Sequence, residues 1–174
     1  YEALSLQGKT DLFSSCRAYV KIQDGCPNRC SYCIIPTVRG PVRSRGLVDI
    51  INECKTLVSA GYSEIVLTGI EVSAYDGAPL SELVRAVSEV DGIRRLRLGS
   101  LTPTCIDRPL LEAMRDSKVF CPHLHLSVQS GCTRILNLMR RKYNKEQLQQ
   151  RIDLIREILP DTMLSADIIT GFPT

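Results

Sequence analysis

Three cysteines within eight residues form the segment of the chain best suited to chemistry, which runs Cys26-Pro27-Asn28-Arg29-Cys30-Ser31-Tyr32-Cys33. Three thiols on one loop can converge on one metal centre. Iron–sulfur clusters are held by cysteine thiolates, normally four for a cubane, so three ligands would leave one iron open to an exogenous ligand. A catalytic zinc site follows the same logic, because three protein ligands keep one position free for substrate. The spacing therefore predicts a metal centre with an open position.

Two other uses of the cysteines compete with this interpretation. Eight cysteines in a small secreted protein would suggest four disulfides, but this chain is long, rich in helical pattern and without an export signal, which favours reduced thiols. The second is structural zinc, with Cys16 or His123 as the fourth ligand. Structural zinc sites usually take paired ligands from two separated clusters, and the sequence has no second CxxC or HxxxH.

The composition is that of an ordinary folded domain. Of the 174 residues, 44% are hydrophobic and 24% are charged, which excludes a disordered or fibrous chain. No apolar run approaches the roughly 18 residues of a membrane-spanning helix, and no signal peptide is apparent, so we expect a cytoplasmic protein without a membrane partner. The chain begins with Tyr1 and breaks off at Thr174 after an apolar run, which suggests a fragment. We expect residues 1–15 to be a linker or arm and residues 16–174 to form one domain, incomplete at its C-terminus.

Short apolar runs alternate with segments of helical period along the domain. The runs predict five strands, over residues 18–22, 65–70, 96–101, 124–128 and 163–169. Alternating strands and helices imply an α/β fold of parallel strands joined by right-handed crossovers. A full eight-fold barrel needs about 250 residues, so five units predict a partial barrel that is truncated after its fifth strand. Chemistry in such folds gathers on the loops that follow the strands, where the cysteine segment lies.

Four helices are expected between these strands. One follows Arg45 and ends at Gly61, with Cys54 on its apolar face as a core residue. A second spans residues 80–87, and a third begins at Asp107, which caps it, with a proline in the first turn. The fourth opens with a capping box that starts at Asn144.

The cysteine array and the segments around it resemble a known family. CxxxCxxC with an aromatic residue before the last cysteine is the signature of radical S-adenosylmethionine (SAM) enzymes, whose fold is a partial (β/α)6 barrel with the array after the first strand. Longer phrases, spread over residues 17–173 in one order, resemble the methylthiotransferase branch of that superfamily. They are Lys21-Ile22-Gln23-Asp24-Gly25-Cys26, Cys33-Ile34-Ile35-Pro36, Arg39-Gly40, Arg43-Ser44-Arg45, Leu67-Thr68-Gly69-Ile70, His123-Leu124-His125-Leu126, Gln129-Ser130-Gly131, Met139-Arg140-Arg141 and Gly171-Phe172-Pro173.

Within this branch, the first and fifth of these phrases are most similar to the MtaB subfamily, which methylthiolates carbon 2 of N6-threonylcarbamoyladenosine beside the tRNA anticodon. The MiaB subfamily, acting on isopentenyladenosine, and the RimO subfamily, acting on an aspartate of a ribosomal protein, are near relatives. The resemblance implies a tRNA methylthiotransferase whose full-length form binds the anticodon loop, and it names no electron donor. RimO-like protein modification and a non-catalytic iron–sulfur or zinc-binding module are the alternatives. Departures from the MtaB pattern are Glu71, Asp76, Thr102 and Cys132.

The resemblance also implies a cofactor site. Cys26, Cys30 and Cys33 would bind a 4Fe-4S cluster, whose open iron chelates the amine and carboxylate of SAM. Other SAM contacts are implied for Tyr32 at the adenine, Thr68, Gly69 and Glu71 near the methionine amine, Gln129 and Ser130 at the ribose, and Ile169 to Gly171 behind the adenine. No catalytic residue beyond the cluster ligands is implied. Ordinary alternatives are a loop-packing role for Tyr32 and a solvated carboxylate for Glu71.

Basic residues and histidines flank these loops. The stretch between Asp24 and Asp49 contains four arginines and no acidic residue. The stretch between Asp116 and Glu146 contains six basic residues and no acidic residue. Basic segments at the mouth of a site suit phosphate contacts, although a solvated surface would explain the second stretch as well. An anticodon-loop adenine would have to be unstacked to reach the site.

The histidines and the remaining cysteines have less distinctive patterns. His123 and His125 alternate along a strand and therefore share a face, either as a hydrogen-bonded lining or as a proton carrier. The five other cysteines form no second array, and we expect most of them to behave as small apolar residues.

Overall fold

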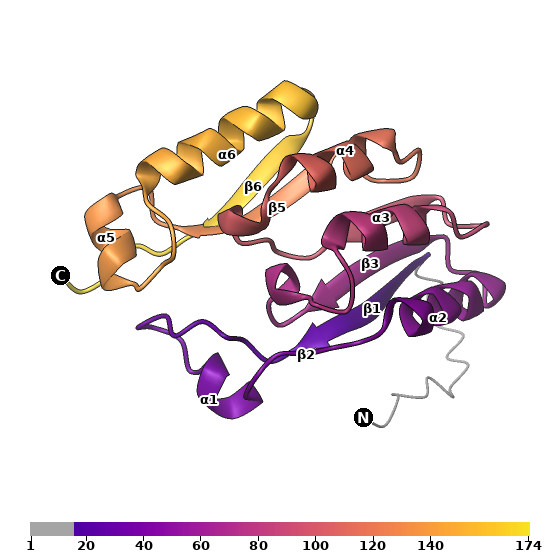
Figure 1. Ribbon diagram of the computed structural model, residues 1–174, viewed down its shortest axis with the longest axis horizontal. Helices are drawn as coiled ribbons and strands as arrows, with labels where there is room; N and C mark the ends of the chain where they lie inside the picture. The colour runs from indigo at the N-terminus through magenta and orange to yellow at the C-terminus, as the bar shows by residue number, and fades with distance from the viewer. Residues whose placement is uncertain (1–15) are drawn as a thin grey trace.

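The computed structural model describes residues 16–174 (Figure 1), so the expected linker at residues 1–15 lies outside the described residues. The strands are β1 (Arg17–Asp24), β2 (Arg43–Ser44), β3 (Glu64–Gly69), β4 (Arg95–Leu98), β5 (His123–Gln129) and β6 (Met163–Ile168). The helices are α1 (Ile35–Arg39), α2 (Leu47–Ser59), α3 (Leu80–Ser88), α4 (Arg108–Asp116), α5 (Thr133–Leu138) and α6 (Lys145–Ile158), with 3-10 turns η1 (Val72–Ala74) and η2 (Pro103–Cys105).

The strands form a curled, open wall. One sheet has the order β2-β1-β3-β4 and the other pairs β5 with β6, and isolated bridges such as Leu101–Leu126 connect the two. The neighbours β1 and β3, β3 and β4, and β5 and β6 are parallel. Their carboxyl ends point to the side of the molecule that carries α1 and α5 (Figure 1). The predicted partial α/β barrel with five parallel strands is confirmed.

The helices that periodicity predicted are present and cover the outer face of the wall. Cys54 on α2 is fully buried in the core, as expected. The side chain of Asp107 accepts a hydrogen bond from the amide of Leu110 at 2.9 Å, and Asn144 and Gln147 form the predicted reciprocal capping box. One strand, β2, and two α-helices, α1 and α5, were not predicted, because each is too short to show a period. No helix within residues 16–174 is long and apolar enough to cross a membrane.

Polar side chains line the face of the strands that is turned away from the helices. On β5, buried leucines alternate with the partly exposed His123 and His125. At the amino end of β3, the Glu64 carboxylate is only 3% exposed and pairs with Arg17 of β1 at 2.7 Å. It also pairs with Arg95 and Arg97 of β4, at 3.1 and 3.0 Å. Burial alone would raise the pKa of Glu64, but the arginines hold it below its usual value.

The loop after β1 is held in place by a strap, which we define as residues 39–45 and which contains β2. The amide of Cys26 donates to the carbonyl of Gly40 at 3.2 Å, and the amide of Arg45 donates to the carbonyl of Ile22 at 2.9 Å. These bonds run on both sides of the short antiparallel pairing of β1 with β2. The strap therefore fixes the point at which the chain leaves the barrel.

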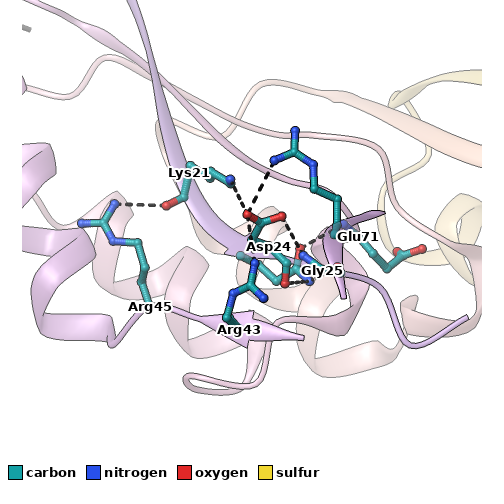
Figure 2. Close-up of polar contacts among 8 residues, drawn as sticks. Lys21, Asp24, Gly25, Arg43, Arg45 and Glu71 are labelled. Carbon is teal, nitrogen blue, oxygen red and sulfur yellow. Dashed lines mark hydrogen bonds and ion pairs between the residues drawn. The ribbon is translucent and has the colours of Figure 1, made fainter. Parts of the chain in front are cut away.

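A buried carboxylate fastens the loop to this strap. Figure 2 shows Lys21 and Arg43 converging on Asp24, whose carboxylate lies 2.9 Å from the Lys21 ammonium and 3.5 Å from the Arg43 guanidinium. Arg39 approaches the same oxygen at 4.0 Å, and the amide of Gly25 donates to the other oxygen at 2.8 Å. The charge of Asp24 thus joins the end of β1 to the last residue of α1 and to the first residue of β2.

The same contacts change the interpretation of the first acid-free stretch. Arg39 and Arg43 are paired with Asp24, and Arg45 binds both Glu53 and the carbonyl of Lys21. Three of the four arginines that suggested phosphate contacts are therefore engaged within the chain. Their acidic partners, Asp24 and Glu53, lie just outside the acid-free stretch. A count of charges within the stretch therefore could not show these pairs.

Gly25 is required where the loop meets the strap. Its φ of +77° lies in the left-handed region, and a Cβ added there would lie 1.9 Å from the carbonyl oxygen of Pro41. Gly61 has a similarly positive φ of +97°, but nothing lies within 4 Å of an added Cβ. A comparison of substitutions at the two glycines therefore separates the effect of backbone strain from that of a steric clash.

We predict that Glu64→Gln lowers the free energy of unfolding by about 1 to 2 kcal/mol at pH 7. The loss is smaller than for a fully buried ion pair, because the guanidinium groups of the arginines reach solvent, which screens their charge. The folded-state pKa of Glu64 is depressed, so its stabilisation exists above the unfolded pKa of about 4.3 and fades as pH falls through the folded value. Urea unfolding at pH 7 and at acid pH measures this difference. Glu157→Gln, which removes an exposed pair with Arg108, is the control and should have little effect. Equal stabilities of wild type and Glu64→Gln at pH 7 would contradict the prediction.

We predict that Gly25→Ala displaces the cysteine loop and lowers the iron bound after anaerobic reconstitution severalfold. Gly61→Ala should cost about 1 kcal/mol of stability through strain and leave iron binding unchanged. Iron analysis together with thermal unfolding of both variants checks the prediction. Full iron binding by Gly25→Ala would show that the loop does not depend on its contact with the strap.

Candidate functional site

The three clustered cysteines lie on the loop between β1 and α1. They are free thiols and partly exposed, and the amide of Cys33 donates to the carbonyl of Cys30 at 3.1 Å, which closes a tight turn. Burial raises the pKa of the Cys26 thiol, and the neighbouring charges of Glu71, Cys30 and Cys33 act in the same direction. Because metals bind the thiolate, an incoming metal would have to displace this proton.

The donor set suits an iron–sulfur cluster better than structural zinc. The eight-residue strand β1 separates Cys16 from the cysteine loop, a span of about 26 Å at about 3.3 Å per residue. His123 likewise begins β5 at the opposite end of the wall. Among residues 16–174, no three Cys, His, Asp or Glu side chains surround a single ion position. A cubane does not require such a position, since each thiolate binds a different iron.

A cleft of about 220 Å³ lies beside the cysteine loop. Its walls come from the loop, from the segments after β3 and β4, and from the chain that follows α5. The lining includes Cys30, Glu71, Thr102, Arg140, Arg141 and Lys142. A thiol, a carboxylate and three cations therefore face one small volume at the carboxyl ends of the strands, where an α/β barrel places its chemistry.

Glu71 is fixed in the wall of this cleft. Its carboxylate accepts hydrogen bonds from the Thr102 hydroxyl at 3.0 and 3.1 Å, and the Asn28 amide lies at 3.5 Å. Its backbone amide donates to the side chain of Gln23 at 2.9 Å. The carboxylate is therefore hydrogen-bonded within the chain, and the contact with SAM implied for it stays a prediction. The same hydrogen bonds give Thr102, a departure from the MtaB pattern, a direct contact with Glu71.

Gly69 allows two strands to approach each other closely. A Cβ at Gly69 would lie 2.9 Å from the side-chain oxygen of Gln23, so the missing side chain makes room for β1. The Gln23 amide is buried and donates to the carbonyls of Asp24 and Gly25 at 3.0 and 2.7 Å. Thr68 precedes this contact and is partly exposed. The sequence phrase that contains Gln23 did not indicate this role in holding the loop.

The cysteine loop is attached on its other side to the end of α5. The Ser31 hydroxyl donates to the carbonyl of Leu138 at 2.8 Å, and the Ser31 amide donates to the carbonyl of Met139 at 3.2 Å. Arg141 donates to the sulfur of Cys30 at 3.6 Å. In the sequence, Arg141 stands in the second acid-free stretch and in the phrase Met139-Arg140-Arg141, and neither indicated contact with the cysteines.

The other implied SAM contacts follow β5 and β6 or lie on the loop, away from the cleft lining. Gln129 ends β5 with a φ of 67°, and its carbonyl accepts the amide of Ile169 at 2.9 Å. Ser130 follows it, and Gly171 has a φ of 68° with open space around it. Tyr32 packs edge-on against Phe172, with ring centroids 6.4 Å apart, and burial raises the pKa of Tyr32 to about 12. The roles implied for these residues stay predictions.

The two histidines belong to a hydrogen-bonded lining. His123 Nε2 and His125 Nδ1 contact the Ser165 hydroxyl at 2.8 and 2.9 Å, and His125 Nε2 contacts Asp167 at 3.0 Å. Burial lowers the pKa of His123, as does the nearby charge of Arg97, which keeps this ring neutral near pH 7. These contacts agree with the interpretation of the two histidines as a hydrogen-bonded lining.

Comparisons with known proteins place the chain in a family. The model of the radical SAM superfamily matches residues 20–174. The tRNA-2-methylthio-N(6)-dimethylallyladenosine synthase of Acetivibrio thermocellus is 44% identical over 90% of this chain, and that of Clostridium botulinum Eklund 17B is 44% identical over 94%. The chain spans only 34% and 37% of the lengths of these two relatives.

Solved structures show the same fold at low sequence identity. The radical SAM methyltransferase TsrM from Kitasatospora setae, with cobalamin and a [4Fe-4S] cluster bound, aligns over 85% of this chain and 30% of its own, with a TM-score of 0.67 and 20% identity. Streptococcus suis SuiB aligns over 91% of this chain and 34% of its own, with a TM-score of 0.65 and 15% identity. With the barrel and cysteine loop described above, the family match shows that this chain belongs to the radical SAM superfamily.

Proposed function

We propose that this chain is the radical SAM core of a tRNA methylthiotransferase, which adds a methylthio group to carbon 2 of an N6-modified adenosine. The observation that carries the proposal is the similarity, at 40 to 44% identity over 90 to 99% of this chain, to several proteins that share one tRNA methylthio-adenosine synthase name. The order of motifs along residues 17–173 supports the same branch. The proposal places the protein in the cytoplasm, where tRNA is modified.

Cys26, Cys30 and Cys33 would hold a 4Fe-4S cluster, and SAM would bind its open iron. When bound, this pair of cofactors would supply the electron and the reactive carbon centre of the reaction. The chain's own residues would orient them. We assign Glu71, Thr68 and Gly69 to the methionine end of SAM, Gln129 and Ser130 to its ribose, and Tyr32, Ile169 and Gly171 to its adenine.

The N6 substituent of the substrate adenosine has two candidates. The names of the relatives point to dimethylallyl, an apolar group. The sequence phrases around Gly25 and Gly69 favour threonylcarbamoyl, which carries a carboxylate. The cleft supports the charged group, because the exposed side chains of Arg140 and Lys142 line it and cations pair with carboxylates. We therefore propose N6-threonylcarbamoyladenosine beside the anticodon as the substrate and dimethylallyladenosine as the alternative.

We predict that single Cys26→Ala, Cys30→Ala and Cys33→Ala substitutions in the full-length protein each prevent assembly of the 4Fe-4S cluster on this loop and abolish the reductive cleavage of SAM to 5′-deoxyadenosine. Cys132→Ser changes an exposed thiol outside the loop and serves as the control, so it should retain the cluster and the cleavage of SAM. Iron analysis and chromatographic detection of 5′-deoxyadenosine provide the measurement. A colourless wild-type protein with stoichiometric zinc would overturn the proposed cofactor.

We predict that the full-length enzyme methylthiolates tRNA that carries N6-threonylcarbamoyladenosine at least tenfold faster than tRNA that carries dimethylallyladenosine, a preference worth about 1.4 kcal/mol in the transition state. Nucleoside mass spectrometry after reaction with each tRNA measures the rates, and ribosomal protein is the control for the RimO alternative. A preference for the dimethylallyl substrate would support the relatives' name instead. Modification of the ribosomal protein alone would contradict the tRNA proposal.

A further inference from the structure

We propose that Arg141 donates a hydrogen bond to the Cys30 sulfur and thereby raises the reduction potential of the cluster held by the three cysteines. The inference rests on the proposed function, because it requires that cluster. It assigns to Arg141 a positioning and tuning role that acts through Cys30. The arginine lies 111 residues further along the chain and reaches the sulfur from the opposite side of the loop to the strap.

The guanidinium of Arg141 is held on several sides. One terminal nitrogen donates to the carbonyl of Ser127 on β5 at 2.7 Å, and the other lies 3.6 Å from the Cys30 sulfur. Its central carbon is 5.3 Å from the centre of the Tyr143 ring, a cation–π contact. Tyr143 is itself buried, and its hydroxyl donates to the carbonyl of Val128 at 2.5 Å. The donor aimed at Cys30 is therefore fixed rather than one rotamer among many.

The backbone before Arg141 adopts a costly conformation that delivers it to this place. Arg140 has a φ of 57°, in the left-handed region that residues with a side chain rarely occupy. The amide of Arg141 donates to the carbonyl of Leu136 at 2.9 Å, which closes the end of α5. The carbonyls of Leu138 and Met139, in the same turn, receive the two hydrogen bonds from Ser31. Strain of this kind persists where surrounding contacts over-determine the geometry, as they do beside the cysteines.

The position of Arg141 carries a second energetic cost, a buried donor without a partner among the described residues. Within residues 16–174, the Nε of Arg141 is the buried side-chain nitrogen or oxygen without a hydrogen-bond partner. Leaving a buried donor unpaired is unfavourable, so the other contacts of the guanidinium outweigh it. The neighbours in sequence, Arg140 and Lys142, also line the cleft but are exposed. They are free to meet a substrate anion, whereas Arg141 is committed to the loop.

A cation at a cluster sulfur has a defined physical effect. Reduction adds one negative charge to the cluster, and the charge is spread over its sulfurs. Hydrogen bonds to these sulfurs and nearby positive charge stabilise the reduced form, which raises the potential. Arg141 stays protonated at every working pH, so this contribution does not depend on pH. Because the arginine is partly shielded from water, its charge is screened less than that of a surface residue.

The test is an EPR-monitored redox titration of the full-length protein, following the reduced-cluster signal that changes when SAM is added. Arg141→Met should lower the ratio of reduced to oxidised cluster at a fixed potential by tenfold or more, and a tenfold change corresponds to about 59 mV for one electron. Arg134→Met removes the same charge from the exposed face of α5, without contact to Cys30, and should leave the titration unchanged. Arg141→Lys keeps the charge but not the fixed donor, and should give an intermediate value.

An unchanged potential in Arg141→Met, with iron content equal to wild type, would overturn the inference. If Arg141→Met fails to retain the cluster, the titration of Arg141→Lys decides: a lowered potential supports the inference and a wild-type potential contradicts it. Loss of the cluster from both variants would make Arg141 a purely structural residue and would also overturn it. Absence of any SAM-sensitive signal from the wild-type protein would instead refute the proposed function.

Discussion

The structure depends on holding a short polar loop rigid between two supports. None of the eight residues from Cys26 to Cys33 is buried, so the hydrophobic effect contributes little to fixing them. Polar contacts replace it. On one side, Asp24 binds the strap through Arg39 and Arg43, and on the other side the turn after α5 binds Ser31 and Cys30. A buried carboxylate and a half-buried guanidinium thus fix the place where three thiols can meet iron.

The barrel makes this arrangement possible because its parallel strands all end on the same side. Loops after β1, β3 and β4 then face one cleft, together with the segment that follows α5, although they are distant in sequence. The core of leucine, isoleucine and valine lies between strands and helices. The opposite face of the strands is polar and carries the Glu64 cluster and the histidine pair. An open wall with a polar lining can accommodate a polar substrate, which a filled apolar barrel could not.

Sequence reasoning predicted what local periodicity and motifs encode. The five parallel strands, the long helices, the cap at Asp107 and the capping box at Asn144 follow from patterns within a few residues. The contacts that support the site do not, since Asp24 meets Arg43 across a reversal of the chain and Arg141 meets Cys30 across the barrel mouth. The close approach of Gln23 to Gly69 likewise depends on strand register, which local patterns do not encode. Charge counting failed for the strap arginines for the same reason.

The central claim is that three thiolates leave one iron free to bind SAM. Pulsed ENDOR of the reduced full-length protein, with SAM labelled by ¹⁵N at the methionine amine, tests it directly. The account predicts a ¹⁵N hyperfine coupling from a nitrogen bound to iron, and its loss in Cys30→Ala. A reduced cluster that shows no coupling to the labelled amine would contradict the account.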